Sequence, residues 1–483
     1  MTSTTTAIPT HDLLIAGRRI APGAGAYSSN LDPATEQPIA YVAQGTVEDA
    51  DRAVAAARAA LPKWSGMRAA DRARILYRMA ELMRAHEEEL IALESLDGGK
   101  PLAAVRRQDV PAAIDTLAYY AGWADKIHGQ VIPTRPGALT YTVREPVGVV
   151  AAIVPWNFPL MIGMWKIAPA LACGCTLVVK PAELTPLSAL RLAELALEAG
   201  VPEGVFNVVT GEGSVVGERL VHHPDVDKVT FTGSPGVGRR IMQGAAGNFK
   251  RVTLELGGKS ANVIFADADL DAAVRAAASG IFFNAGQVCS AGSRILVQGA
   301  VYDQVVERLA ERANAVRVGS PQESGTAMGP LISKKQMDTV LGYIDIGRCE
   351  GAQVVAGGAR VGERGFFVAP TVLAEVRHEM RVSQEEIFGP VASVIRFEDE
   401  ADAIRIANGT QFSLAAGVWS SDIGRVHRVA HALKAGTVWI NTYGYTDVRL
   451  PWGGARDSGL GREHGDAAIE NFTEPKAVWL ATA

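Results

Sequence analysis

Two segments contain residues that could carry out covalent chemistry, and the first is Phe283 to Ser290 (FNAGQVCS). It contains Cys289, which is expected in a loop between a helix and a strand at 294–297. Loops on a rigid scaffold often carry nucleophiles, and a thiolate is a strong nucleophile. A lone cysteine is also often a small buried hydrophobic residue, so this alternative for Cys289 stays open from the pattern alone.

The second segment is Thr253 to Lys259 (TLELGGK), in which the acid Glu255 stands among apolar residues on a predicted buried strand. Burial disfavours the charged form of a carboxyl group, so it would raise the pKa of Glu255 and prepare a general base. However, Glu255 also follows Gly233 by 22 residues, where an acid that binds the ribose of a dinucleotide is expected. The spacing leaves both roles open.

Two further segments are typical of phosphate and ribose binding. Phe231 to Gly238 (FTGSPGVG) follows a predicted strand, and Ser234 and Pro235 suit the start of a helix whose free amides could bind a pyrophosphate. Its spacing is not G-x-G-x-x-G, and a plain glycine turn is the alternative. Lys180 and Glu183 follow another buried strand and could bind a ribose diol, although a solvated strand end is the simpler interpretation. Because Glu183 would repel a 2′-phosphate, it favours NAD over NADP.

The elements that must position these residues alternate between strand and helix, which is typical of α/β proteins. Strands joined by helical crossovers, as in an open doubly wound sheet, are predicted at 148–154, 176–179, 205–209, 228–232 and 252–256. One long helix is expected from about Ala69 to Leu96. A second α/β pattern runs from about Lys259 to Asp457, and 471–480 is expected to be an extended strand.

The composition argues against several classes of protein. The chain has 483 residues and a net charge of −5, whereas nucleic-acid binding needs clustered cationic charge, so no nucleic-acid partner is expected. Four cysteines are too few for a disulfide framework, and Met1 to Thr10 lacks the pattern of a secretory signal, which favours a cytoplasmic protein. Cys173 and Cys175 are expected in the core and the histidines show no metal spacing, so no metal site is predicted. Without a convincing Cys/His pairing, a papain-like hydrolase is weakly supported.

The segment Pro146 to Trp165 has no charged residue and is long enough to span a bilayer. Pro155, Asn157 and Pro159 would leave backbone groups without partners in lipid. The stretch 148–154 is therefore interpreted as a buried parallel strand that ends in a polar loop, and no membrane partner is expected.

Seven motifs, taken together and in order, resemble those of the aldehyde dehydrogenase superfamily. They cover most of the chain: Pro155-Trp-Asn-Phe-Pro159, Lys180-Pro-Ala-Glu183, Phe231-Thr-Gly-Ser234, Glu255-Leu-Gly-Gly258, Gly286-Gln-Val-Cys289, Glu386-Ile-Phe-Gly-Pro390, and Pro451-Trp-Gly-Gly454 with Ser458-Gly-Leu-Gly-Arg462. Each motif is weak alone, but the ordered set is highly specific.

The resemblance implies an aldehyde dehydrogenase-like α/β fold with two doubly wound domains and a small β flap for oligomerisation. The dinucleotide-binding domain would comprise 1–125 and 144–258, and the catalytic domain 259–457. The oligomerisation region would comprise 126–143 and 468–483, with a homodimer or homotetramer as the expected assembly.

The resemblance also implies a role for each site residue. Cys289 would be the nucleophile, Asn157 and the Cys289 backbone N–H would donate to the oxyanion, Glu255 would activate water, and Lys166 would support them. The implied cofactor is NAD, held by Val154, Trp156, Lys180, Glu183, Gly213, Phe231, Gly233, Ser234, Glu386 and Phe388. The implied substrate pocket comprises Phe158, Trp165, Phe283, Tyr443 and Trp452.

The implied reaction is oxidation of an aldehyde to the carboxylic acid through a cysteine thiohemiacetal and a thioester. An apolar or aromatic aldehyde is the expected substrate, and the alternative is betaine aldehyde or another amino-aldehyde, because several aromatic residues could surround a cation. Arg456 stands where many members have Lys, which should matter little, and the loop Tyr443 to Leu450 matches no substrate-specific pattern.

Two other functions fit these residues less well. A CoA-acylating dehydrogenase would typically lack the deacylating acid, whereas Glu255 is present. A catalytically silent structural protein on the same scaffold would not need Asn157, Glu255 and Cys289 together.

Overall fold

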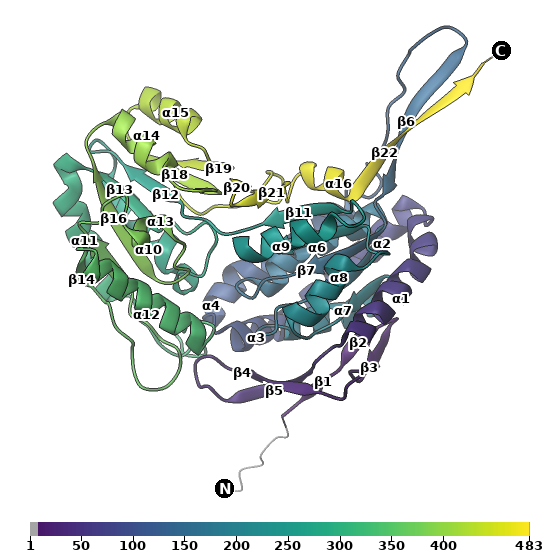
Figure 1. The fold of residues 1–483 in the computed structure, drawn as a ribbon, viewed down its shortest axis with the longest axis horizontal. Helices are drawn as coiled ribbons and strands as arrows, with labels where there is room; N and C mark the ends of the chain where they lie inside the picture. The colour runs from purple at the N-terminus through teal and green to yellow at the C-terminus, as the bar shows by residue number, and fades with distance from the viewer. Residues whose placement is uncertain (1–7, 483) are drawn as a thin grey trace, which may run out of the picture.

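The computed structural model describes residues 8–482 and is built on two large, mostly parallel sheets with helices packed against them (Figure 1). This architecture confirms the predicted α/β fold class. Residues 1–7, which make up most of the segment considered for a secretory signal, lie outside the described residues, as does Ala483 of the expected oligomerisation region.

The larger sheet has eight strands, and its middle strands are parallel and buried on both faces. In spatial order its strands are β21 (Gly459–Leu460), β11 (Arg251–Glu255), β10 (Lys228–Thr232), β7 (Val149–Ile153), β8 (Thr176–Lys180), β9 (Phe206–Val208), β2 (Leu13–Ile15) and β3 (Arg18–Ile20). The predicted strands of the first half are confirmed, and β21, β2 and β3 add antiparallel edges. Because β8, β7, β10 and β11 are parallel neighbours, their carboxyl ends meet at one edge of the sheet.

The second sheet has seven strands and one antiparallel pair, β14 with β15. Its strands in spatial order are β14 (Gln353–Ala356), β15 (Thr371–Ala374), β16 (Val391–Phe397), β13 (Arg294–Gln298), β12 (Ala261–Ile264), β18 (Ala415–Trp419) and β19 (Thr437–Ile440). Smaller sheets pair β1 (Thr10–His11), β5 (Pro38–Ala43) and β4 (Tyr27–Leu31), and β17 (Phe412–Ser413) with β20 (Ala455–Arg456).

Helices cover both large sheets (Figure 1). The helices of the first half are α1 (Val47–Ser65), α2 (Ala69–Ala85), α3 (Glu87–Gly98), α4 (Leu102–Ala104), α5 (Val110–Ala121), α6 (Pro159–Cys173), α7 (Leu187–Ala199), α8 (Glu218–His222) and α9 (Pro235–Ala245). Those of the second half are α10 (Leu270–Phe282), α11 (Tyr302–Ala315), α12 (Lys334–Cys349), α13 (Arg381–Gln384), α14 (Glu400–Asn408), α15 (Ile423–Ala432) and α16 (Ala467–Phe472).

Two predicted elements are partly wrong. The single helix expected from about Ala69 to Leu96 is broken at His86 (φ −105°, ψ 22°), and three glutamates in the first turn of α3 then favour a new helix start there. The strand expected at 471–480 begins later, because the end of α16 occupies residues up to Phe472.

The uncharged segment Pro146 to Trp165 forms β7, a loop and the first part of α6. All residues of α6 are buried, as expected of a helix that is apolar apart from Lys166 and lies inside a large protein. No helix within residues 8–482 has both the length and the apolar character needed to cross a bilayer.

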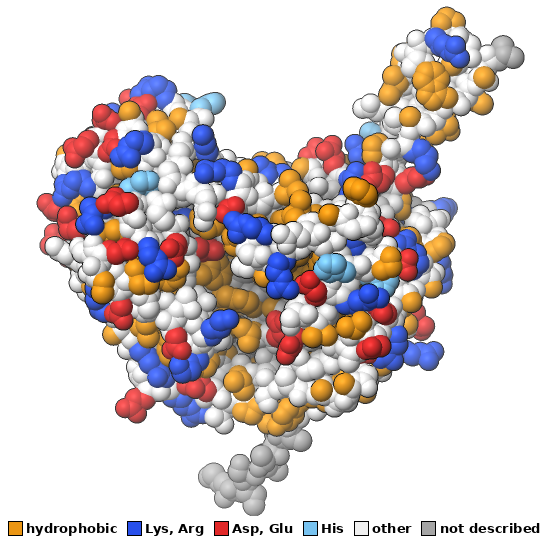
Figure 2. All heavy atoms as spheres, in the orientation of Figure 1, with side chains coloured by type: hydrophobic (Ala, Val, Ile, Leu, Met, Phe, Trp, Pro, Cys, Tyr) orange, Lys and Arg blue, Asp and Glu red, His pale blue; other side chains and the backbone are white. Residues whose placement is uncertain are grey.

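A two-stranded ribbon projects from the body of the protein (Figure 1). It pairs β6 (Ala138–Pro146) with the antiparallel strand β22 (Thr473–Ala481). Figure 2 shows hydrophobic side chains on this ribbon, and Val131, Leu139, Trp479 and Leu480 are among the exposed ones in or beside it.

Candidate active site

Cys289 lies between two cavities. On one side is the aromatic pocket, which we define by the walls that Phe158, Trp165, Phe283, Tyr443 and Trp452 provide; its volume is about 140 Å³. On the other side is a cavity of about 250 Å³, which Asn157, Glu386 and Phe388 line. Cys289 lines both, so a molecule in either cavity can approach its sulfur.

The chain before Cys289 has an unusual conformation that turns it sharply after α10. Asn284, Ala285 and Gly286 all have positive φ, at 50°, 52° and 71°. A Cβ on Gly286 would lie 2.0 Å from the carbonyl oxygen of Gly389, so only glycine fits there. Such left-handed conformations cost energy for residues other than glycine and are common at functional sites.

Asn157 lies at the carboxyl end of β7 and is held by the same turn. Its Nδ2 donates to the Gln287 carbonyl at 2.9 Å, and its own carbonyl accepts from Asn284 Nδ2 at 3.1 Å. An amide nitrogen has two protons, so one N–H of Asn157 remains for a ligand in the cavity that Asn157 and Cys289 both line.

Glu255 ends β11 beside Gly453, where a Cβ would lie 2.5 Å from its Oε1. Burial, and then the negative charge of Glu463, raise the pKa of Glu255 well above its ordinary value, while Lys166 and Arg462 oppose the rise. Glu255 does not line either cavity beside Cys289, but it is close enough for its charge to raise the pKa of the thiol.

Lys166 lies on α6 and forms a buried ion pair with Glu463, at 2.6 Å between Nζ and Oε1.

Removing one partner of a buried ion pair leaves an uncompensated charge, so Lys166→Met should lower the free energy of unfolding by about 3–5 kcal/mol. Lys334→Met, which breaks the exposed pair of Lys334 with Asp338, should cost less than about 1 kcal/mol. Urea unfolding measures both, and equal midpoints for the two variants would contradict the expectation.

A long cleft continues from the cavity of Asn157 and Glu386. A further cavity, of about 690 Å³, shares Pro155, Trp156, Thr232 and Gly233 with it. The ten residues expected to bind the cofactor all line this cleft: Val154, Trp156, Lys180, Glu183, Gly213, Phe231, Gly233, Ser234, Glu386 and Phe388.

The groups along the cleft fit a dinucleotide. At one end, Lys180 Nζ donates to Glu183 Oε1 at 2.9 Å, and the Gly213 N–H donates to the same oxygen. In the middle, Ser234 caps α9, so the free amides of that helix face the region where a pyrophosphate would lie. An acid, a lysine and a helix N-terminus thus occur along one cleft in the order that a ribose and a pyrophosphate require.

The end of the cleft beside Cys289 is shaped by Glu386 and Phe388. Glu386 Oε1 accepts from the Gly258 N–H at 2.9 Å, and burial raises the pKa of this carboxyl to about 7. The ring of Phe388 meets the Trp156 ring edge-on at 5.2 Å. Gln336 donates to the Phe388 carbonyl at 2.9 Å, which holds this turn at positive φ.

Tyr443 forms a wall of the aromatic pocket, but its hydroxyl group already donates a hydrogen bond within the protein. It donates to the carbonyl of Ser290, the residue after Cys289, at 2.9 Å. The ring fits against three glycines, because a Cβ on Gly280, Gly292 or Gly417 would come within about 3 Å of it. Tyr443 therefore helps to position the Cys289 loop in addition to shaping the pocket.

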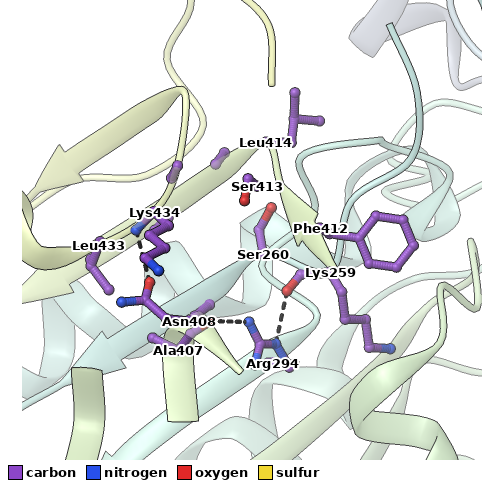
Figure 3. Close-up of a pocket in the computed structure, with 14 residues that line it drawn as sticks. Lys259, Ser260, Arg294, Ala407, Asn408, Phe412, Ser413, Leu414, Leu433 and Lys434 are labelled. Carbon is purple, nitrogen blue, oxygen red and sulfur yellow. Dashed lines mark hydrogen bonds between the residues drawn. The ribbon is translucent and has the colours of Figure 1, made fainter. Parts of the chain in front are cut away.

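A much smaller pocket, of about 10 Å³, lies at the start of β12 and β13. Figure 3 shows the residues that line it. Arg294 crosses it and donates to the carbonyls of Lys259 at 2.8 Å and Ala407 at 2.7 Å. The hydroxyls of Ser260 and Ser413, which border it, have no partner among the described residues. It can hold about one water molecule, so it is no candidate for an aldehyde or a dinucleotide.

Several polar residues of the site were not anticipated from the sequence, among them Lys100, Gln336 and Glu463. Lys100 Nζ donates to the Asn157 carbonyl at 3.2 Å and lies 3.6 Å above the Phe158 ring. Each reaches the site from a distant part of the chain, and none belongs to a motif with its own chemical signature. The glycine pair directly before Lys100 was the only available signal for it in the sequence.

Comparisons with known proteins agree on one family. A model of the aldehyde dehydrogenase family matches residues 21–478. An aldehyde dehydrogenase of Emericella nidulans is 51% identical over 450 residues, which cover 93% of this chain and 90% of that protein. The structure of an aldehyde dehydrogenase from Bacillus cereus in complex with NAD+ is 48% identical, with a TM-score of 0.97 over 98% of this chain and 97% of that one. A betaine aldehyde dehydrogenase from Staphylococcus aureus, also with NAD+, is 42% identical, with a TM-score of 0.96 over 98% and 95% of the two chains.

Proposed function

The chain belongs to the aldehyde dehydrogenase family, and we propose that it oxidises an aldehyde to the carboxylic acid with NAD as the hydride acceptor. One observation carries this proposal: Cys289 is the side chain that lines both the aromatic pocket and the end of the long cleft. An aldehyde in the pocket and a dinucleotide in the cleft would meet at its sulfur.

In the proposed mechanism, the Cys289 thiolate attacks the aldehyde carbon and forms a thiohemiacetal. The free N–H of Asn157 and the backbone N–H of Cys289 donate to the oxyanion. NAD, held beside Cys289 by Glu386 and Phe388, would supply the hydride acceptor, so that the oxyanion could collapse to a thioester. Glu255 then takes a proton from water, the water oxygen attacks the thioester, and the acid and the thiolate are released. Lys166 supports this step, since its buried pair with Glu463 lies beside Glu255.

NAD is proposed in preference to NADP because Glu183 faces the cleft close to Lys180. A second phosphate on the ribose would meet this carboxylate, and like charges repel. The similar Bacillus cereus and Staphylococcus aureus enzymes, which were solved with NAD+, support the same cofactor.

A panel of aldehydes tested with NAD and with NADP examines this function directly. We expect NADH and free acid in equal amounts, and a lower kcat/KM with NADP. Formation of acyl-CoA in place of the acid would show a CoA-acylating enzyme, and failure to reduce either dinucleotide with any aldehyde would overturn the proposal.

The reactivity of the Cys289 thiol should depend steeply on pH. Burial, together with the carboxylates Glu255 and Glu386, raises the pKa of this thiol to about 12 in the unliganded chain. Only the thiolate reacts, so alkylation by iodoacetamide should rise about tenfold per pH unit between pH 7 and 10. Added NAD+ should accelerate it, because its positively charged pyridinium ring, placed at the end of the cleft beside Cys289, would stabilise the thiolate.

This measurement needs the exposed Cys349 replaced by Ser, with modification at Cys289 followed by peptide mass spectrometry. A rate that stays constant over the same pH range would contradict the expectation.

We also propose that the chain is divided as the resemblance implies, into a dinucleotide-binding domain, a catalytic domain and an oligomerisation region. We propose that it assembles as a homodimer or homotetramer. The projecting ribbon supports assembly, because Val131, Leu139, Trp479 and Leu480 are exposed in or beside it. Apolar side chains on a projecting pair of strands are stabilised when another subunit covers them.

A further inference from the structure

Arg107 is the one charged side chain among the residues that line the aromatic pocket. The other polar residues that line the pocket include Gln108, Ser279, Ser290 and Thr446, and all of these are neutral. The pocket thus has apolar walls, a nucleophile on one side, and a single positive charge. No carboxylate from the described part of the chain lines it.

The backbone that carries Arg107 is fixed to the pocket wall. Val105–Asp109 forms a π-helical turn between α4 and α5, a local feature that is frequent at functional sites. Asp109, which ends this turn, is buried and pairs with Lys100. Lys100 in turn contacts the Asn157 carbonyl and the ring of Phe158, so the turn is tied to residues beside Cys289.

The acids near this end of the pocket already have partners. Glu88 pairs with Arg106, the neighbour of Arg107, and Asp109 pairs with Lys100. In the loop that lines the opposite part of the pocket, Arg449 binds Asp447 through Nε at 2.8 Å and Nη2 at 2.5 Å.

Arg107 is exposed at the edge of the pocket, and its side chain forms no hydrogen bond or ion pair with another residue that the structure describes. Trp452, another wall of the pocket, likewise has an indole N–H without an acceptor among residues 8–482. The pocket therefore has a buried indole N–H without a partner and, at its edge, a guanidinium that is free to bind a ligand.

We propose that Arg107 selects aldehydes that carry a carboxylate at the end remote from the aldehyde group, with an apolar or aromatic segment between the two. This inference rests on the proposed function. A guanidinium binds a carboxylate through two parallel hydrogen bonds, and the aromatic walls would pack the middle of the substrate. The same charge disfavours betaine aldehyde, because its quaternary ammonium would meet a like charge with no carboxylate to balance it.

The test uses substrates that differ in charge but little in shape. 4-Formylbenzoate is compared with 4-formylbenzamide. In the same way, 4-oxobutanoate and its longer homologues are compared with their amides. Betaine aldehyde is compared with 3,3-dimethylbutanal, which has a carbon atom in place of the charged nitrogen. For the best-fitting length, kcat/KM for the carboxylate should exceed that for its amide by about tenfold. This ratio should fall towards one in Arg107→Gln and below one in Arg107→Glu. Arg107→Glu should also raise the ratio of betaine aldehyde to 3,3-dimethylbutanal.

Arg106→Gln is the matched control, since Arg106 is the adjacent arginine, pairs with Glu88 and does not line the pocket. It should keep the wild-type ratios. Equal rates for carboxylates and amides in the wild type, or a ratio that Arg107→Gln leaves unchanged, would overturn the selection by Arg107 while the oxidation of amides upholds the proposed function. If no aldehyde of the panel reduces NAD, the proposed function itself is wrong.

Discussion

Replacing Cys289 with Ala should lower aldehyde-dependent NADH formation by about 10⁴-fold or more, while the affinity for NADH stays within about threefold of the wild type. The loss is large because the proposed route forms and breaks a bond to the Cys289 sulfur in every turnover, and alanine offers no nucleophile. The affinity is retained because the ten residues expected to bind the cofactor, from Val154 to Phe388, do not include Cys289. Steady-state absorbance at saturating aldehyde and fluorescence titration with NADH measure the two quantities.

Cys349→Ala is the matched control for this variant. Cys349 is an exposed cysteine at the end of α12, away from both cavities, so its loss should leave kcat within about twofold. Turnover by Cys289→Ala at more than about a tenth of the wild-type rate would show that the chemistry does not pass through this sulfur.

The position of the site within the fold could be predicted from the sequence because it depends on a local rule. Asn157, Lys180, Gly233 and Glu255 each lie at or just after the carboxyl end of a buried strand, and in an open parallel sheet these ends share one edge. The apolar strands and the glycines that end them are visible in the sequence, so the edge and its residues follow without knowledge of the long-range contacts.

The electrostatic surroundings of the site could not be predicted in the same way. Glu463 reaches Lys166 across 297 positions of the chain, and Lys100 reaches Asn157 across 57. A buried charge and its partner leave no periodic pattern in the sequence, because either residue alone is typical of an exposed surface. The proposed role of Arg107 could not be predicted from the sequence for the same reason. It depends on Glu88 and Asp109 being paired with other residues, which only the structure shows.

The two roles left open for Glu255 by its spacing differ in their structural consequences. A ribose ligand would lie with Lys180 and Glu183 in the long cleft, whereas Glu255 lies beside Gly453 and does not line that cavity. Its charge instead acts on the Cys289 thiol, which favours the role of general base.

Replacing Glu255 with Gln should separate the two halves of the reaction. In the proposed mechanism the hydride step needs Cys289 and Asn157 and not Glu255, so a rapid burst of about one NADH per active site should remain. Hydrolysis of the thioester needs a base to take a proton from water, so steady-state turnover should fall by about 10²–10³-fold. Stopped-flow absorbance measures the burst, and mass spectrometry of the quenched enzyme should show the acyl group on the Cys289 peptide.

The pH dependence of deacylation provides an independent check on the same residue. Burial and Glu463 raise the pKa of Glu255, and only its ionised form can accept a proton, so deacylation in the wild type should accelerate as pH rises through this raised pKa. Glu255→Gln should lose this rise.

Glu94→Gln is the control, because it changes another buried glutamate that lines neither cavity. It should keep both the rise with pH and the turnover. A Glu255→Gln enzyme that loses the burst together with the turnover would instead place Glu255 before the hydride step, and the assignment as the deacylating base would be wrong.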